Sequence, residues 1–181
     1  MRAGGRTTVM SPRAVSAICL VILVAAAACN EPPNKPAVQP TPSMASVAGG
    51  CAATVLTNAE PPQWAQSGWS VTKGAPWPVP WAMTTPGDAV AFLFATRLVA
   101  GPSPRIDGSN NKVLWVLREP RQFIVEGRPQ GKSTPVITVP GGPSIVDVPS
   151  PGCWTFRLIP SDGSGVSTIS LEVLPHGARP I

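Results

Sequence analysis

Two alternating runs in the stretch Trp154–Val173, WTFRLIPSDGSGVSTISLEV, decide the fold class of this chain. Apolar residues occupy every second position of both runs: Trp154, Phe156 and Leu158, then Ile169, Leu171 and Val173. Such alternation places the apolar side chains on one face of a β-strand. The glycine-rich segment SDGSG, residues 161–165, separates the runs. The whole stretch therefore predicts a β-hairpin.

Short apolar runs bounded by Pro, Gly, Asn or Asp continue upstream, and no segment shows a convincing amphipathic helix. We expect further strands near residues 52–57, 89–99, 112–119, 122–128, 135–139 and 144–148. About seven to nine short strands at this spacing favour an all-β domain built as a two-sheet sandwich or a barrel.

Two of these strands carry expectations about their faces. In AVAFLFATRLV, residues 89–99, we expect Arg97 on one face and the following side chains on the other: Val90, Phe92, Phe94 and Leu98. KVLWVLRE, residues 112–119, is apolar on both faces, as a central strand can be. The pattern leaves open whether Trp115 or the pair Leu114 and Val116 faces the core.

The N-terminus indicates an export signal over residues 1–28. It carries Arg2, Arg6 and Arg13 and no acidic residue, and an uncharged, largely apolar run of 15 residues follows at 14–28. A transmembrane helix needs roughly 20 apolar residues, whereas the apolar region of a signal peptide needs about 7–15. The run fits a signal peptide better, and either Met1 or Met10 could be the first residue of such a signal.

Cys29 follows four alanines, and Ala26-Ala27-Ala28-Cys29 resembles a bacterial lipobox. The resemblance implies cleavage before Cys29 and attachment of a diacylglycerol to its thiol, which would anchor the protein to the outer side of the cell membrane. The alternative is an ordinary signal peptide with an incidental cysteine.

We expect residues 29–50 to form a proline-rich linker, because proline-rich segments favour the extended polyproline II conformation.

The remaining chain has the size of one domain, which we place at residues 51–175, with a C-terminal tail at 176–181. The formal charge of +5 falls to +2 once the three signal-peptide arginines are removed, since eleven basic residues then face nine acidic ones. No dense Lys/Arg run is present, so a nucleic-acid partner is not expected. Cys51 and Cys153 form an even pair, which predicts a disulfide in an exported domain; two free buried thiols are the alternative.

Three segments also resemble a known group of proteins: PSIVDVPSPGCWTFRL (143–158), NNKVLWVLREPR (110–121) and the lipobox. Together they are similar to functionally uncharacterised predicted lipoproteins of actinobacteria and related Gram-positive bacteria. The resemblance implies an immunoglobulin-like sandwich in which a P-x-x-G-x-W element leads into the penultimate strand, and a location in the cell envelope. The cysteine spacing departs from the antibody pattern, so only an Ig-like topology is expected. No catalytic or binding residues carry over.

No catalytic constellation, metal site or cofactor motif stands out. His176 is the single histidine, and Ser144 lacks the G-x-S-x-G context of a nucleophile elbow. DGSNN, residues 107–111, begins like a calcium loop, but Lys112 and Arg118 stand where Gly and Glu are needed. We therefore expect DGSNN to be a turn, and we expect neither a metal nor a cofactor.

Two sets of residues are candidates for binding. The first set lies in a proline-rich segment and comprises Trp64, Trp69, Trp77 and Trp81. These indoles either form a platform for sugars or a proline-rich partner, or they complete the core. The second set comprises Arg118, Arg121 and Arg128, with Arg105 as a further member. It would either meet anionic lipids or wall polymers or remain as solvated charges.

The sequence thus predicts a lipid-anchored, non-enzymatic binding or accessory module of the cell envelope. Its partner would be an envelope protein or a cell-wall polymer, in addition to the membrane that holds its anchor. A small extracytoplasmic hydrolase with an unrecognised site is the alternative. A solute-binding lipoprotein is disfavoured, because those usually have two α/β lobes and a longer chain.

Overall fold

The computed structural model describes residues 46–105 and 107–179, which form eleven strands and one short 3₁₀ helix. The elements are β1 Ser46–Val47, β2 Leu56–Thr57, η1 Gln63–Ala65, β3 Trp81–Met83, β4 Ala89–Leu93, β5 Leu98–Val99, β6 Lys112–Leu117, β7 Phe123–Pro129, β8 Ile137–Pro140, β9 Gly142–Ile145, β10 Gly152–Pro160 and β11 Ser167–Leu174. No α-helix forms in these residues. The predicted signal peptide, Cys29 and most of the predicted linker lie outside the described residues.

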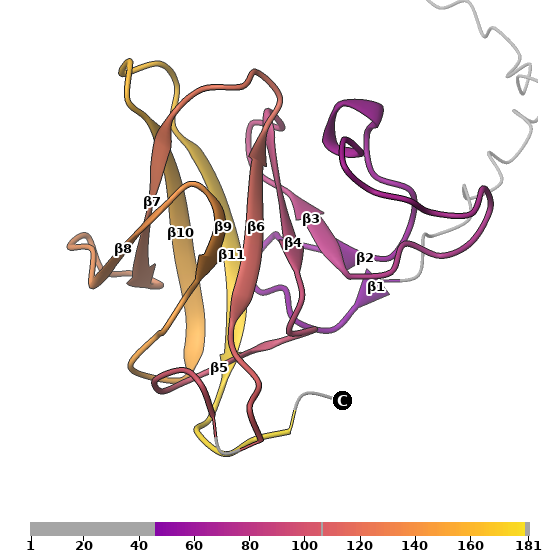
Figure 1. Cartoon of the computed structure of the whole chain (residues 1–181). Coiled ribbons are helices and arrows are strands. Elements are labelled where there is room, and N and C mark those ends of the chain that lie inside the picture. The colour runs from indigo at the N-terminus through magenta and orange to yellow at the C-terminus, as the bar shows by residue number, and fades with distance from the viewer. Residues whose placement is uncertain (1–45, 106, 180–181) are drawn as a thin grey trace, which may run out of the picture. The chain divides into compact units, whose positions relative to one another are not determined.

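The strands form two sheets, one of which curls as a half-barrel (Figure 1). The six-stranded sheet has the order β1-β2-β3-β4-β6-β9, and all its pairs are antiparallel. The five-stranded sheet has the order β5-β11-β10-β7-β8, in which β5 runs parallel to β11. The prediction of an all-β domain with two sheets is confirmed.

The predicted C-terminal hairpin is present as β10 and β11. Trp154 lies opposite Leu171 and Phe156 lies opposite Ile169, so the apolar positions of both runs share one face. On its other side β10 pairs with β7 over seven residues. β10 is therefore the central strand of the five-stranded sheet, with a hydrogen-bonded neighbour on each side.

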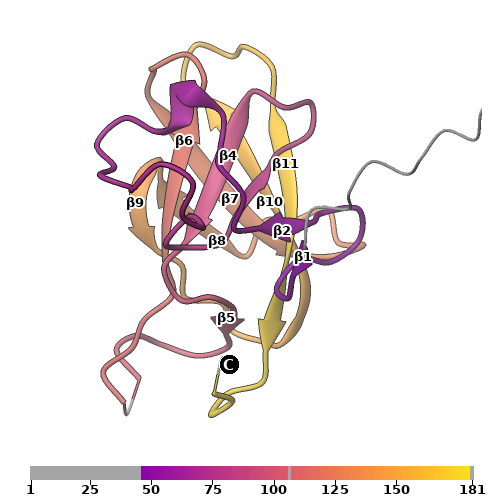
Figure 2. The same cartoon turned by 90° about the vertical axis from the view of Figure 1, so that its right-hand side faces the viewer.

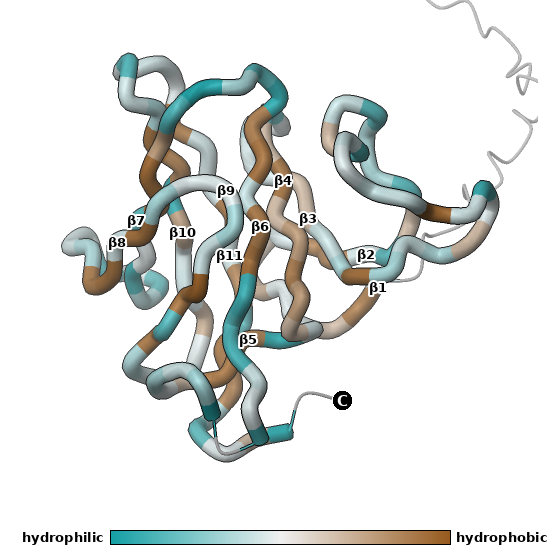
Figure 3. Tube along the Cα trace, viewed as in Figure 1, coloured by the Kyte–Doolittle hydropathy of each residue, from teal (hydrophilic) through white to brown (hydrophobic). Residues whose placement is uncertain are grey.

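The main core lies between the two sheets, and hydrophobic segments follow the strands while the connecting loops are more hydrophilic (Figure 3). On β6 it is Trp115, and not Leu114 or Val116, whose side chain is buried in this core. Its ring packs against Phe156, with 5.5 Å between the centroids. Its indole N–H donates to the hydroxyl of Ser144 at 2.9 Å, so a buried polar atom is satisfied.

The prediction of a single strand at residues 89–99 is wrong. β4 ends at Leu93, the chain turns at residues 94–97, and β5 joins the opposite sheet beside β11. Phe94 is 43% exposed and does not share a face with Leu98. Thr96 has φ +39°, a conformation that L-residues rarely adopt. The pairing of β5 with β11, together with an ion pair between Arg97 and Glu172, holds this crossover in place.

The strand count exceeds the predicted seven to nine because β1 and β3 were not predicted and β5 was not predicted as a separate strand; these three contain only two or three residues each. Strands of this length are too short to produce an alternating pattern in the sequence. β1 lies within residues predicted as linker, yet it pairs with β2.

β4 is buried on both faces. Ala89, Ala91 and Leu93 belong to the core between the sheets, whereas Val90 and Phe92 point to the outer side of the six-stranded sheet. There they pack in a second apolar cluster with Trp77, Trp81 and Ala65. The segment 58–80, which includes η1, lies over this outer face of β4 and β6 (Figure 2). The segment 58–80 is therefore a third, irregular layer outside the two sheets.

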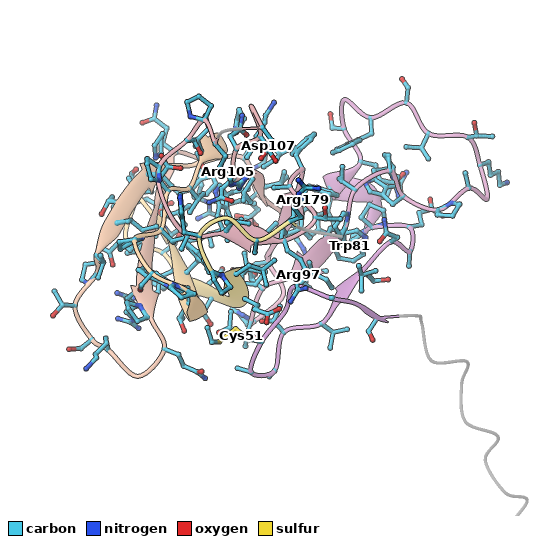
Figure 4. All side chains as sticks on the ribbon, turned by 90° about the horizontal axis from the view of Figure 1, so that it is seen from below. Cys51, Trp81, Arg97, Arg105, Asp107 and Arg179 are labelled. Carbon is cyan, nitrogen blue, oxygen red and sulfur yellow. A yellow bond between two sulfur atoms is a disulfide. The ribbon has the colours of Figure 1, made fainter. Side chains whose placement is uncertain are left out.

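The predicted disulfide joins Cys51 to Cys153 on β10, with 5.9 Å between their Cα atoms (Figure 4). The chain around Cys51 also lies along β11. Cys51 N–H donates to the carbonyl of Ser170 at 3.3 Å, and Glu172 N–H donates to the carbonyl of Gly49 at 2.8 Å. The start of the domain is thus attached to the five-stranded sheet by a covalent bond and by backbone hydrogen bonds.

Asn111 is fully enclosed, although the sequence placed it in a predicted turn. The turn precedes Asn111: Gly108 N–H donates to the carbonyl of Arg105 and Arg105 N–H donates to the carbonyl of Ser109, both at 2.9 Å (Figure 4 labels Arg105 and Asp107). The Asn111 amide donates to the carbonyls of Val99 at 2.8 Å and Val146 at 2.9 Å, and its oxygen accepts the N–H of Val99 at 3.0 Å. One side chain therefore ties β5 to the segment that follows β9.

Candidate functional site

A pocket of about 720 Å³ opens between the segment 58–80 and the short strands β1 and β2. Its lining is mixed. Apolar surface comes from side chains such as Val47, Val71, Trp69 and Trp77, and polar groups come from Thr57, Asn58, Glu60, Gln66, Thr72 and Lys73. A concave site with an apolar base and a few polar groups is typical of ligand-binding sites in general.

The structure divides the four candidate tryptophans. Trp77 and Trp81 are buried, at 4% and 7% exposure, whereas Trp64 and Trp69 are partly buried at the margin of the same cluster. Trp81 donates its indole N–H to the carbonyl of Ala59 at 2.8 Å. All four thus contribute to the second apolar cluster, and only Trp69 and Trp77 line the pocket.

Trp69 is held by three aromatic rings. Its ring centroid lies 5.1 Å from that of Phe92, 5.3 Å from that of Trp77 and 5.8 Å from that of Phe94. The planes of Trp69 and Phe94 are nearly parallel, at 17°, which is an offset-stacked arrangement. Trp69 is therefore a partly exposed indole whose position is fixed before any ligand arrives.

Hydrogen bonds fix the irregular chain around the pocket. The Asn58 amide donates to the carbonyl of Trp77 at 2.7 Å, and Trp77 N–H donates back to the carbonyl of Asn58 at 2.7 Å. The Gln66 amide donates to one carboxylate oxygen of Glu60 at 3.1 Å and to the carbonyl of Pro61 at 2.7 Å. The two ends of the segment are thereby fastened to each other.

Other polar groups of the pocket have no partner among the described residues. The side chains of Thr72 and Lys73 make no hydrogen bond there, and one oxygen of Glu60 is also unused. The indole nitrogen of Trp77 is shielded from solvent and likewise has no partner in the part of the chain that the structure describes. The groups available to a ligand are therefore the exposed side chains of Glu60, Thr72 and Lys73 and not the enclosed Trp77 nitrogen.

The arginine candidates do not form one patch. Arg118 and Arg121 line a smaller hollow of about 250 Å³ with Asp88, Glu119 and Ser164. Arg128 lies near the far end of β7 and donates to the carbonyl of Ser133 at 2.9 Å. It lies seven positions after Arg121 along a largely extended chain, which corresponds to about 23 Å.

Each of these arginines already has partners in the fold. Arg118 donates to the carbonyl of Gly87 at 3.0 Å, and its guanidinium lies 5.5 Å from the ring centre of Trp64. Arg121 forms ion pairs with Glu119 and, at 3.1 Å, with Asp162. Arg105 donates to the hydroxyl of Ser109 at 2.9 Å and also contacts Asn111. These contacts favour a structural role.

Asp162 gives a pH-dependent prediction. The hydroxyl and N–H of Ser164 donate to its carboxylate, and with nearby Arg121 they hold the pKa of Asp162 below its ordinary value of 3.8. Stability from this charged form is present above 3.8 and is lost as the pH falls through the lowered pKa. We expect Ser164→Ala to raise the pKa of Asp162 towards 3.8, as measured from its carboxyl ¹³C shift by NMR.

The equivalent turn supplies the control. Ser109 makes the same two hydrogen bonds to Asp107, whose pKa is also lowered. Ser109→Ala should therefore shift Asp107 and leave Asp162 unchanged. An unchanged Asp162 titration in Ser164→Ala would contradict the assignment.

The residues considered for chemistry are not assembled into a reactive site. The hydroxyl of Ser144 is buried and accepts the Trp115 N–H, and His176 Nδ1 lies 3.1 Å from the carbonyl of Ala100. Within residues 46–105 and 107–179, no group of three or more His, Cys, Asp and Glu side chains could hold a metal ion. The same residues contain no helix long and apolar enough to cross a membrane.

Comparisons of the chain with protein-family profiles, with curated proteins and with solved structures found no match.

Proposed function

We propose that this protein is a lipid-anchored, non-enzymatic binding module of the cell envelope whose partner is a cell-wall polymer or another envelope protein. The observation that carries the proposal is the pocket of about 720 Å³ beside Trp69. It combines a fixed, partly exposed indole with unused polar groups, while none of the residues considered for catalysis lies in it.

The anchor and the spacer complete the proposal. Lipidation of Cys29 would attach the protein to the membrane, and the proline-rich residues 30–45 would act as a semi-rigid spacer. We further propose that the domain has an Ig-like topology. Two sheets of mainly antiparallel strands and five crossings of the chain between them, from β4 to β10, support that assignment.

The test is crosslinking in cells that express the membrane-anchored protein. One photo-crosslinking residue replaces Ala75, an exposed residue that lines the pocket, and a second one replaces Lys132, an exposed lysine in the turn between β7 and β8. We expect position 75 to recover wall fragments or one envelope protein repeatedly, and position 132 not to. Equal recovery from both positions would contradict a binding site at the pocket, and Cys29→Ser protein that stays in the membrane fraction would contradict the lipid anchor.

A further inference from the structure

We propose that the pocket beside Trp69 binds a sugar ring of a glycan, with the ring stacked on the Trp69 indole and its hydroxyls bonded by Glu60, Thr72 and Lys73. The inference rests on the proposed function and deepens it, because it names the chemical class of the ligand and the groups that would recognise it.

The Trp69 indole offers a surface on which a sugar ring can stack. One face of a pyranose ring presents C–H groups, which form an apolar surface that fits the flat face of an indole. Trp69 lines the pocket and is partly exposed. Phe92, Phe94 and Trp77 fix its ring, so a ligand would not have to order it on binding. A binding group that is fixed in advance loses little conformational entropy when the complex forms.

The pocket also offers hydrogen-bonding groups for the hydroxyls of a sugar. Sugar hydroxyls both donate and accept, so a site that recognises them needs donors and acceptors close together. The unused oxygen of Glu60 is an acceptor, and Lys73 and Thr72 carry donors without partners in the described chain.

The lining favours a sugar over the other occupants considered for the tryptophans and arginines. A proline-rich peptide binds along a groove with several exposed aromatic rings, whereas this pocket offers one partly exposed indole, because Trp77 and Trp81 are buried and Trp64 does not line it. An anionic lipid surface is attracted by clustered positive charge, whereas Lys73 shares the pocket with Glu60.

The experiment titrates the detergent-solubilised full chain by isothermal calorimetry and by tryptophan fluorescence. The probes are tetrasaccharides of N-acetylglucosamine, glucose and mannose, and a peptide with the chain's own sequence PPNKPAVQPT, residues 32–41. We expect saturable binding of at least one tetrasaccharide and none of the peptide. Absence of saturable binding by all three sugars, or binding of the peptide alone, would overturn the proposal.

Variants locate the site. We expect Trp69→Ala to weaken sugar binding by up to about tenfold, since an aromatic contact of this kind contributes up to about one factor of ten. Trp64→Ala is the matched control, because Trp64 packs on the same cluster but does not line the pocket. It should leave sugar affinity unchanged, and equal weakening by both variants would overturn the assignment of the site.

Two further variants exclude an effect of misfolding. Glu60 and Lys73 are exposed, so Glu60→Gln and Lys73→Met should leave the unfolding temperature unchanged and still weaken binding. Unchanged sugar affinity in both would contradict the assigned polar contacts. If no sugar binds while the probe at position 75 still recovers one envelope protein, the sugar proposal fails and the proposed binding function stands.

Discussion

Replacement of Asn111 by alanine is expected to lower the free energy of unfolding by about 3–5 kcal/mol. Asn111 is 0% exposed and satisfies the N–H and carbonyl of Val99 and the carbonyl of Val146. Alanine would leave these three backbone groups without their partner in a place that water does not reach. Each unsatisfied buried group costs about 1–3 kcal/mol, and the two segments joined by Asn111 belong to different sheets.

The measurement is urea unfolding followed by tryptophan fluorescence, with Asn110→Ala as the matched control. Asn110 is the same residue type one position earlier and makes no side-chain hydrogen bond in the described structure, so its replacement should change the free energy by less than about 0.5 kcal/mol. A loss below about 1 kcal/mol in Asn111→Ala would contradict the role assigned to this amide.

Removal of the disulfide by Cys51→Ser together with Cys153→Ser is expected to lower the free energy of unfolding by about 4–5 kcal/mol in the chain-entropy account. The two cysteines are 102 residues apart, so the bond closes a long loop and strongly restricts the unfolded chain. A domain whose total stability is about 5–15 kcal/mol would lose a large fraction of it.

Thr54→Ala is the control, because it removes a local contact beside the disulfide and leaves the covalent bond intact. The Thr54 hydroxyl accepts the N–H of Ser170 at 2.9 Å, so its loss should cost only about 1 kcal/mol. Wild-type protein reduced with dithiothreitol should match the double variant. Urea midpoints that are the same for oxidised, reduced and double-variant protein would show that the bond does not stabilise this fold.

The success and failure of the sequence predictions have physical causes. The β10–β11 hairpin was predictable because one face of both strands is buried and the loop between them is rich in glycine. The break after Leu93 was not, because AVAFLFATRLV contains neither Gly nor Pro, and only pairing with the distant β11 makes the chain leave its sheet. Asn111 was misplaced because its partners, Val99 and Val146, are distant in sequence.

The candidate site was predictable only in part. The proline-rich tryptophan segment pointed to the correct region, and the core alternative describes Trp77 and Trp81. The pocket itself depends on the contact between Asn58 and Trp77, which are 19 residues apart in irregular chain. Glu60 and Lys73 belong to no periodic pattern, so nothing in the sequence marked them.

The disulfide also determines how mechanical tension would pass through the domain. A pull on the chain before Ser46 reaches Cys51 and crosses the covalent bond to β10, which is hydrogen-bonded along both edges in its sheet. Residues 52–152 form a closed loop between the cysteines, and a stretching force between the two chain ends cannot extend this loop. Of the pocket-lining residues, Val47 alone lies outside this loop. Tension between the two chain ends would therefore separate β1 from β2 while most of the pocket keeps its shape.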